Sequence, residues 1–264
     1  GEWRVVVADQ QIKGQGTHGR TWASPRGNVY TTFSTVAPIP PQHLSDVPQI
    51  VVIAIMQVLK TFGLEPQYKW VNDVLINDRK ISGILCRTGG MRGDNVILHI
   101  GIGINVALSV IDCNALSQPA TSINLALGKQ VNKEVVIELL KRSLAHHFYC
   151  YLQVGRLFMV DELNTRLAFK DQNITFDLED NKKTVIQGTL LGIDEKGWII
   201  IRNSENGSVQ SHHSGRILRG QELEIYMQQN ALRSVSLSHM FTTPAFERTH
   251  FEEIGSTQDY LRDN

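Results

Sequence analysis

The stretch from Lys69 to Arg87, KWVNDVLINDRKISGILCR, constrains the fold of this chain more than any other part of it. Short β-prone or apolar runs alternate in it with polar residues, and Asn77-Asp78 is a dipeptide typical of tight hairpin turns. We therefore expect strands at residues 67–70, 74–76 and 81–85, joined as an antiparallel ribbon.

The ribbon carries a concentrated set of polar side chains. They are Lys69, Asn72, Asp73, Arg79 and Lys80. Ammonium groups beside a carboxylate and an amide suit an anionic ligand, because lysine offers a point charge to phosphate or carboxylate and aspartate helps to hold magnesium. Gly83 would let such a ligand approach the backbone. Any single lysine here is more simply a solvated surface charge, but the whole pattern favours anion binding.

Composition narrows the function classes. The 264 residues are 42% hydrophobic, enough for a substantial core in one large or two smaller domains. Lys+Arg and Asp+Glu both number 26, so we expect neither a nucleic-acid partner nor an acidic membrane partner. The three cysteines, Cys86, Cys113 and Cys150, lack CxxC spacing, which argues against a disulfide framework and a zinc site and favours the cytoplasm. We find no apolar run long enough to span a bilayer.

A glycine-rich loop follows the expected strand at residues 3–8. Gly14, Gly16 and Gly19 match the dinucleotide-binding pattern GxGxxG, but that reading requires a helix next, whereas Pro25 and a strand-like run at 29–33 follow. The remaining interpretations are a flexible surface loop, or a loop between two strands whose N–H groups wrap an anion that Arg20 neutralises.

The rest of the chain alternates between helical and strand patterns. Helices are expected at 44–62, 132–152 and 160–168, and a buried strand at 96–106 ends in GIGIN. Short strands at 173–178, 184–193, 198–202 and 209–212, separated by turn residues, suggest a small barrel. Residues 228–246 lose periodicity and are expected to form a linker, after which THFEEIGSTQDYLRDN predicts a strand and a helix.

These motifs together resemble those of the biotin protein ligases, of the monofunctional type without a DNA-binding domain. The resemblance lies in KW-V-ND with DRK-I-SGIL, in the loop from Gly14 to Trp22, in GIGIN and in GIDEKGWIII. It implies an α+β fold, with a mixed sheet and flanking helices of the class II synthetase-like catalytic domain and a small SH3-like β-barrel. The implied domains are 1–170 (catalytic), completed by 247–264, then 171–227 (SH3-like) and the 228–246 linker.

The resemblance also implies a reaction. Biotin and Mg-ATP would form biotinyl-5′-AMP, and a lysine of a biotin carboxyl carrier protein domain of acetyl-CoA carboxylase would then accept the biotin. Magnesium would arrive with ATP, no resident metal site is expected, and no side chain need form a covalent intermediate. The sequence leaves the choice between a monomer and a homodimer open.

The site residues that the resemblance implies fall into three groups. The catalytic group is Lys80, Arg20 and Asp73. The biotin group is Ser256, Thr257, Gln258, Gln11, Gly14, Gln15, Gly16, Thr17, Lys80 and Gly83. The nucleotide group is Gly19, Arg20, Trp22, Asn72 and Asn105. Gln15 and Thr17 stand where the family commonly has arginine, which weakens the expected retention of the intermediate.

The order of the motifs departs from the family. Ser256, Thr257 and Gln258 resemble the S-T-N motif near the beginning of the ligase domain, yet they lie at the end of this chain. We therefore expect a circular permutation with Asn264 close to Gly1; a domain-swapped segment or displaced numbering are the alternatives.

Two other functions compete with biotin ligation. A lipoate or octanoate attachment enzyme has a related fold but would be expected to lack the paired hairpin motifs. A biotin-responsive repressor or a non-catalytic biotin-binding module would bind biotin; the repressor would need a helix-turn-helix, and the module would release no pyrophosphate.

Overall fold

The computed structural model describes residues 3–180, 182 and 184–236. The chain divides into two units, residues 1–225 and 226–264.

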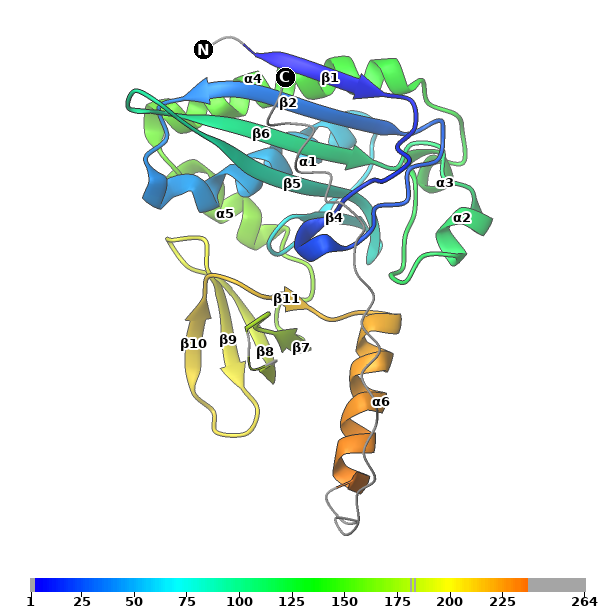
Figure 1. Ribbon diagram of the computed structural model, residues 1–264, viewed down its shortest axis with the longest axis vertical. Helices are drawn as coiled ribbons and strands as arrows, with labels where there is room; N and C mark the ends of the chain where they lie inside the picture. Colours follow the sequence, from blue (N-terminus) through cyan, green and yellow to red (C-terminus); the bar gives the residue numbers. More distant parts are fainter. Residues whose placement is uncertain (1–2, 181, 183, 237–264) are drawn as a thin grey trace, which may run out of the picture. The chain divides into compact units, whose positions relative to one another are not determined.

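A six-stranded sheet is the centre of the first unit (Figure 1), with the strand order β1-β2-β6-β5-β4-β3. Its strands are β1 (Arg4–Ala8), β2 (Val29–Ala37), β3 (Gln67–Lys69), β4 (Asp73–Ile76), β5 (Arg79–Arg92) and β6 (Asn95–Ile104). All its ladders are antiparallel, and parallel pairing occurs among the described residues only as isolated bridges. The sheet that we expected to be mixed is thus antiparallel, because hairpins rather than helical crossovers join β3 to β6.

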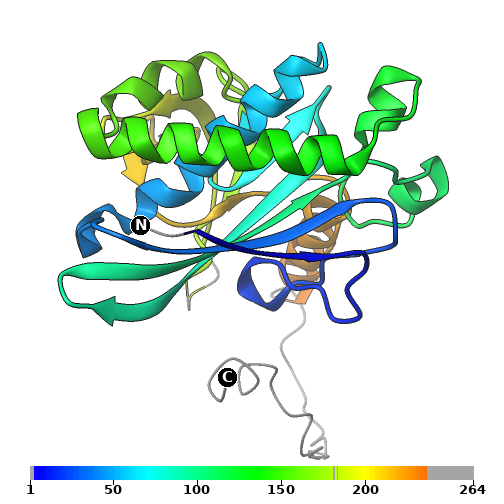
Figure 2. The same ribbon diagram turned by 90° about the horizontal axis from the view of Figure 1, so that it is seen from above.

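Helices cover one face of this sheet. They are α1 (Val47–Thr61), α4 (Lys133–Val154) and α5 (Leu157–Thr165), with the short α2 (Val110–Asn114) and α3 (Ile123–Leu127) beyond β6. Figure 2 shows α1 and α4 on one side of the sheet and the glycine loop, in dark blue, on the other. The glycine-loop side is therefore the face left open by the helices.

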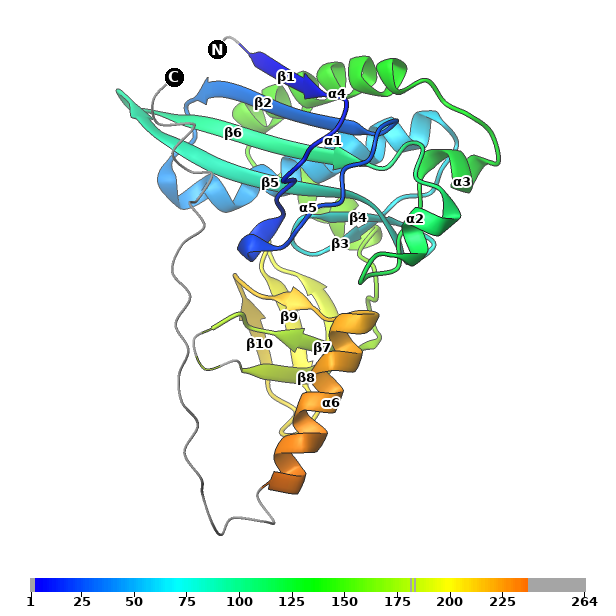
Figure 3. The same ribbon diagram turned by 45° about the vertical axis from the view of Figure 1, so that its right-hand side comes forward.

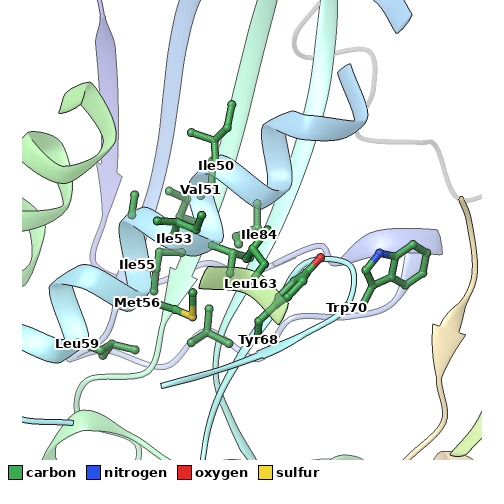
Figure 4. Close-up of a cluster of buried hydrophobic side chains, with 14 of the residues drawn as sticks. Ile50, Val51, Ile53, Ile55, Met56, Leu59, Tyr68, Trp70, Ile84 and Leu163 are labelled. Atoms are coloured by element: carbon green, nitrogen blue, oxygen red, sulfur yellow. The ribbon is translucent and has the colours of Figure 1, made fainter. Parts of the chain in front are cut away.

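The core lies between α1 and the sheet. Most side chains of α1 are buried, and Ile50, Val51 and Met56 belong to the same cluster as Tyr68 and Ile84 (Figure 4). The stretch Pro41–Thr61 is long and apolar enough to cross a membrane by length and composition, so our expectation of no such run was wrong. The most apolar 18 residues of this stretch are 67% buried inside the fold, as in the core helix of a globular protein.

A five-stranded antiparallel sheet follows in the same unit (Figure 3), with the order β10-β9-β8-β7-β11. Its strands are β7 (Asn173–Asp177), β8 (Val185–Ile193), β9 (Ile199–Asn203), β10 (Val209–His212) and β11 (Arg216–Ile217). The four strands predicted here are confirmed, whereas the two-residue β11 was missed because it is too short to show a period. Trp70 Nε1 and Gln49 Nε2 both donate to the Gly197 carbonyl, at 3.0 and 2.8 Å, and tie the two sheets together.

The expected linker is helical where it is described. Helix α6 spans Gln221–Ser236 and thus includes the first part of the 228–246 segment. Gln228 and Gln229 are good helix formers, and their polarity, rather than any helix breaker, suggested a linker. The remainder of that segment and the whole of 247–264, with Ser256, Thr257 and Gln258, lie outside the described residues, as does the predicted proximity of Asn264 and Gly1.

Candidate active site

An irregularity between β4 and β5 aims Lys80 into the open face of the sheet. Val74 pairs with Ser82 and Leu75 pairs with Lys80, which leaves Ile81 as an extra residue, a β-bulge. Lys80 and Gly83 would lie on opposite faces of a regular strand, since side chains alternate with a period of two. With the bulge they share a face, and a Cβ built on Gly83 would lie 3.2 Å from Lys80 Cε.

Asp73 lies between two ammonium groups. Lys80 Nζ is 2.7 Å from Asp73 Oδ1, and Lys69 Nζ is 3.8 Å from Asp73 Oδ2. Burial lowers the pKa of Lys69, while the Asp73 carboxylate acts to raise it. The Lys69 side chain is 7% exposed and that of Lys80 is 21% exposed, so Lys80 is the ammonium that a ligand can reach.

The backbone of Lys80 is fixed by a buried asparagine. Lys80 donates its N–H to the Pro119 carbonyl at 2.8 Å, and its own carbonyl accepts from Thr121 N at 2.9 Å. Asn105 is 3% exposed, and its Nδ2 donates to the carbonyls of Lys80 and Thr121 at 3.4 and 3.0 Å. These bonds give Asn105 a positioning role, and its contact with a nucleotide stays a prediction.

Two glycines form a flat platform beside Lys80. Gly83 and Gly103 are directly paired across β5 and β6, and a Cβ on either would come within 2.7 Å of the Trp22 ring. Trp22 therefore lies against the sheet, with Lys80 Nζ 5.1 Å from the centroid of its ring, a cation–π arrangement. Its Nε1 is buried against Gly103 and has no hydrogen-bond partner among the residues described.

The glycine loop folds back on itself to deliver Trp22. Trp22 N donates to the Gly14 carbonyl at 2.9 Å, and Gly16 N donates to the Arg20 carbonyl at 2.7 Å. Between them Thr17–Gly19 forms a 3₁₀ turn in which Gly19 has a φ of 71°. The loop lies between two strands, as predicted, but two of the N–H groups expected to wrap an anion are used within it.

The polar side chains of the loop are held by neighbours. Gln11 Nε2 donates to Ser24 Oγ at 2.9 Å, and Gln15 Oε1 accepts from Arg87 Nη2 at 2.8 Å. Arg20 Nη2 donates to Thr17 Oγ1 at 2.6 Å.

Two groups predicted to act on the ligand also have protein partners. Arg20 Nη1 is 3.2 Å from Glu179 Oε1, a contact with the five-stranded sheet region. Asn72 Nδ2 donates to the Ile84 carbonyl at 2.7 Å, which fixes the turn before β4. A direct contact of Asn72 with metal or phosphate stays a prediction.

The structure thus brings the ribbon and the loop together. Lys80, Asp73, Gly83 and Trp22 meet at one point of the open sheet face, and Arg20 lies at the tip of the same loop. Sequence reasoning missed the platform role of Gly103, although its place in GIGIN on the face opposite the buried isoleucines was a usable signal. It also missed Glu179, for which no local signal exists, since 159 residues separate it from Arg20.

No group of three or more His, Cys, Asp or Glu side chains that could hold a metal ion occurs in the part of the chain that the structure describes. Asp73 is the carboxylate next to the platform, and both its oxygens face lysines.

Comparison with known proteins finds similarity over part of the chain. Residues 2–106 match the model of the biotin/lipoate A/B protein ligase family. The chain is 28% identical to the bifunctional ligase/repressor BirA of Bacillus subtilis over 211 residues, which are 77% of this chain and 63% of that protein. It is 31% identical to the biotin–[acetyl-CoA-carboxylase] ligase of Paracoccus denitrificans over 149 residues, 53% of this chain and 60% of the relative.

Solved structures agree on the fold. The biotin protein ligase of Aquifex aeolicus in complex with biotin and ATP superposes with a TM-score of 0.66, covering 81% of this chain and 87% of that one at 24% identity. The curated relatives are covered over less than two thirds of their length. Over residues 2–106 the chain is similar to the biotin/lipoate A/B protein ligase family, and this range contains the hairpin and the glycine loop that carry the resemblance.

Proposed function

We propose that this chain is a biotin protein ligase, which joins biotin to a lysine of a biotin carboxyl carrier protein in an ATP-dependent reaction. The observation that carries the proposal is the Lys80–Asp73 pair beside the Gly83–Gly103 platform, with Trp22 of the glycine loop against it. The names of the relatives, which include ligases acting on biotin, support it. The five-stranded sheet would correspond to the SH3-like domain of the family, and the protein would act in the cytoplasm.

The first step joins two anions, the biotin carboxylate and the α-phosphate of Mg-ATP. A carboxylate oxygen attacks phosphorus, the bond from phosphorus to the bridging oxygen breaks, and pyrophosphate leaves with magnesium. Lys80 is the partly exposed cation at the platform, so its ammonium would offset the negative charge that accumulates between the reacting groups. Arg20 would add charge from the loop side.

The second step consumes the mixed anhydride. The neutral amine of the acceptor lysine attacks the biotinyl carbonyl, the bond to the phosphate oxygen breaks, AMP leaves, and the amine loses a proton. Asp73, held by Lys80 and Lys69, would orient the incoming ammonium before it loses its proton. Closure of the glycine loop over the anhydride would exclude water and prevent hydrolysis.

The biotin pocket would be completed by the remaining predicted residues. Gln11, Gly14, Gly16 and Gly83 would line it from the described part of the chain, and Ser256, Thr257 and Gln258 from the tail if the permuted order holds. Gly19 and Trp22 would face the nucleotide. A homodimer is compatible with this arrangement.

The proposal is tested by the choice of acid. Purified protein is incubated with Mg-ATP and, separately, biotin, lipoate or octanoate, and pyrophosphate is measured. We expect pyrophosphate release when the acid is biotin, and none when it is lipoate or octanoate. Release with lipoate or octanoate instead would assign the chain to the other branch of its family, and biotin binding without pyrophosphate would identify a non-catalytic module.

A further inference from the structure

Two arginines and a histidine converge on one carboxylate, that of Glu179. Its Oε1 lies 3.2 Å from Arg20 Nη1 and 3.3 Å from Arg216 Nε, and its Oε2 lies 3.0 Å from His18 Nε2. The Glu179 side chain is 12% exposed, whereas those of Arg20 and His18 are 35% and 57% exposed, so the carboxylate is mostly buried and its partners on the loop partly face water. Figure 3 shows the glycine loop, in dark blue, near the five-stranded sheet, and Glu179 belongs to the connection between β7 and β8 of that sheet.

Glu179 is positioned by its own backbone. Its N–H donates to Asp177 Oδ1 at 2.8 Å, and its φ of 52° lies in the left-handed region, which is uncommon for a non-glycine residue. Arg216, behind it, also contacts Asp177 at 3.4 Å and Glu222 at 2.7 Å. The Glu179 carboxylate is therefore held from both sides, by Arg216 and by the side chains of the glycine loop.

The glycine loop is also attached to β5 of the six-stranded sheet. Gln15 accepts a hydrogen bond from Arg87 of β5 at 2.8 Å, and Thr17 accepts one from Arg20 at 2.6 Å. These are the two positions at which the resemblance leads one to expect arginines. In this chain their side chains instead bind arginines, so neutral acceptors secure the loop where charges would otherwise face the ligand.

We propose that Glu179 is a positioning residue that holds the glycine loop closed through Arg20 and His18. The loop then covers the platform because a carboxylate of the β7–β8 connection anchors it, and this anchor sets how long an acyl-adenylate is retained. The statement about retention rests on the proposed function, whereas the anchoring of the loop does not.

Limited trypsin digestion of the ligand-free protein tests the anchor. Glu179→Gln keeps the shape of the side chain and removes its charge, and Glu205→Gln changes an exposed glutamate in the β9–β10 turn as a matched control. We expect cleavage after Arg20, identified by fragment mass, to rise at least about fivefold in Glu179→Gln, since proteolysis tracks the population of the open loop. Glu205→Gln should behave as the wild type.

His18→Ala removes one of the two loop side chains that contact Glu179. Because the His18 side chain is 57% exposed, this substitution is not expected to disturb folding. It should also raise cleavage after Arg20. Unchanged cleavage in both Glu179→Gln and His18→Ala would overturn the proposal.

Release of preformed biotinyl-AMP is the second readout, and we expect it to be several-fold faster in Glu179→Gln than in Glu205→Gln. Faster cleavage with unchanged release would refute the role in retention. If the wild type makes no adenylate, the proposed function fails, and the trypsin result still decides whether Glu179 anchors the loop.

Discussion

The Lys80 ammonium lies 2.7 Å from the Asp73 carboxylate, across the bulged pair of strands β4 and β5. This contact fixes the lysine before any ligand arrives. An ion pair that is already oriented costs little reorganisation when charge develops nearby, which is the condition for strong electrostatic catalysis. The bulge at Ile81 is what puts Lys80 on the same face as the glycine platform.

Removing the charge of Asp73 should leave Lys80 poorly placed. For Asp73→Asn we expect biotinyl-AMP formation to slow by up to about 100-fold, since a small misplacement of a catalytic group can cost that much. Asp78→Asn, in the exposed turn of the same hairpin, is the control and should be near wild type. Single-turnover measurement of adenylate formation checks this; equal rates for the two variants would show that Asp73 does not position Lys80.

The platform predicts a sharp difference between two glycines of β6. Gly103→Ala would put a Cβ 2.7 Å from the Trp22 ring, whereas Gly101→Ala meets Leu85 O at 3.3 Å and lies away from Trp22. Overpacking of this kind costs about 1–3 kcal/mol. We expect Gly103→Ala to displace the glycine loop and to raise the half-saturating biotin concentration by roughly tenfold. Comparable values for both alanine variants would argue against the platform.

Cys86 should be dispensable although it lies on β5 close to the site in sequence. Burial raises the pKa of its thiol to about 12, so almost no thiolate forms at neutral pH. We expect Cys86→Ser to keep biotinylation activity within about twofold of the wild type. Thiol labelling of the folded protein should modify Cys150 before Cys86. Inactivation upon specific modification of Cys86 would point to a covalent role that the account excludes.

His147 makes stability depend on pH. Burial lowers the pKa of its imidazole, and the hydrogen bond from Nδ1 to the Ser143 carbonyl, at 2.7 Å, acts to raise it. The folded protein thus binds fewer protons than the unfolded chain below about pH 6.5, so stability is lost as the pH falls through that value. Urea unfolding about one unit above and one unit below this pH should show a smaller loss for His147→Gln than for the wild type. An equal loss would exclude His147 as a contributor.

The parts of the fold that were predictable depend on local patterns. Turn dipeptides and alternating apolar residues predict the ribbon at 67–85 and the strands before and after the glycine loop. Helix α4 begins where Asn132 predicts it, because the Asn132 side chain accepts a hydrogen bond from Glu134 N. Strand β5 extends to Arg92, well past the predicted end at residue 85. Gly89 and Gly90 are typical of a loop, but the ladder with β6 keeps residues 86–92 in the extended strand.

The parts that were not predictable depend on tertiary contacts. The bulge at Ile81 has no signature in the sequence, yet it decides which face Lys80 occupies. The anchoring of Arg20 by Glu179 joins residues that no periodicity relates. Asn105 shows the same limit: its motif is recognisable, but only the packed structure reveals that its amide secures Lys80 and Thr121.

The most direct test of the central claim follows biotin onto an acceptor. Wild-type protein, Lys80→Ala and the exposed neighbour variant Arg79→Ala are each incubated with biotin, Mg-ATP and a biotin carboxyl carrier protein domain, and the intact mass of the domain is recorded. We expect one biotin per domain with the wild type and Arg79→Ala, and a rate about 10²–10³-fold lower with Lys80→Ala. Undiminished transfer by Lys80→Ala would contradict the mechanism, and no transfer by the wild type would contradict the function.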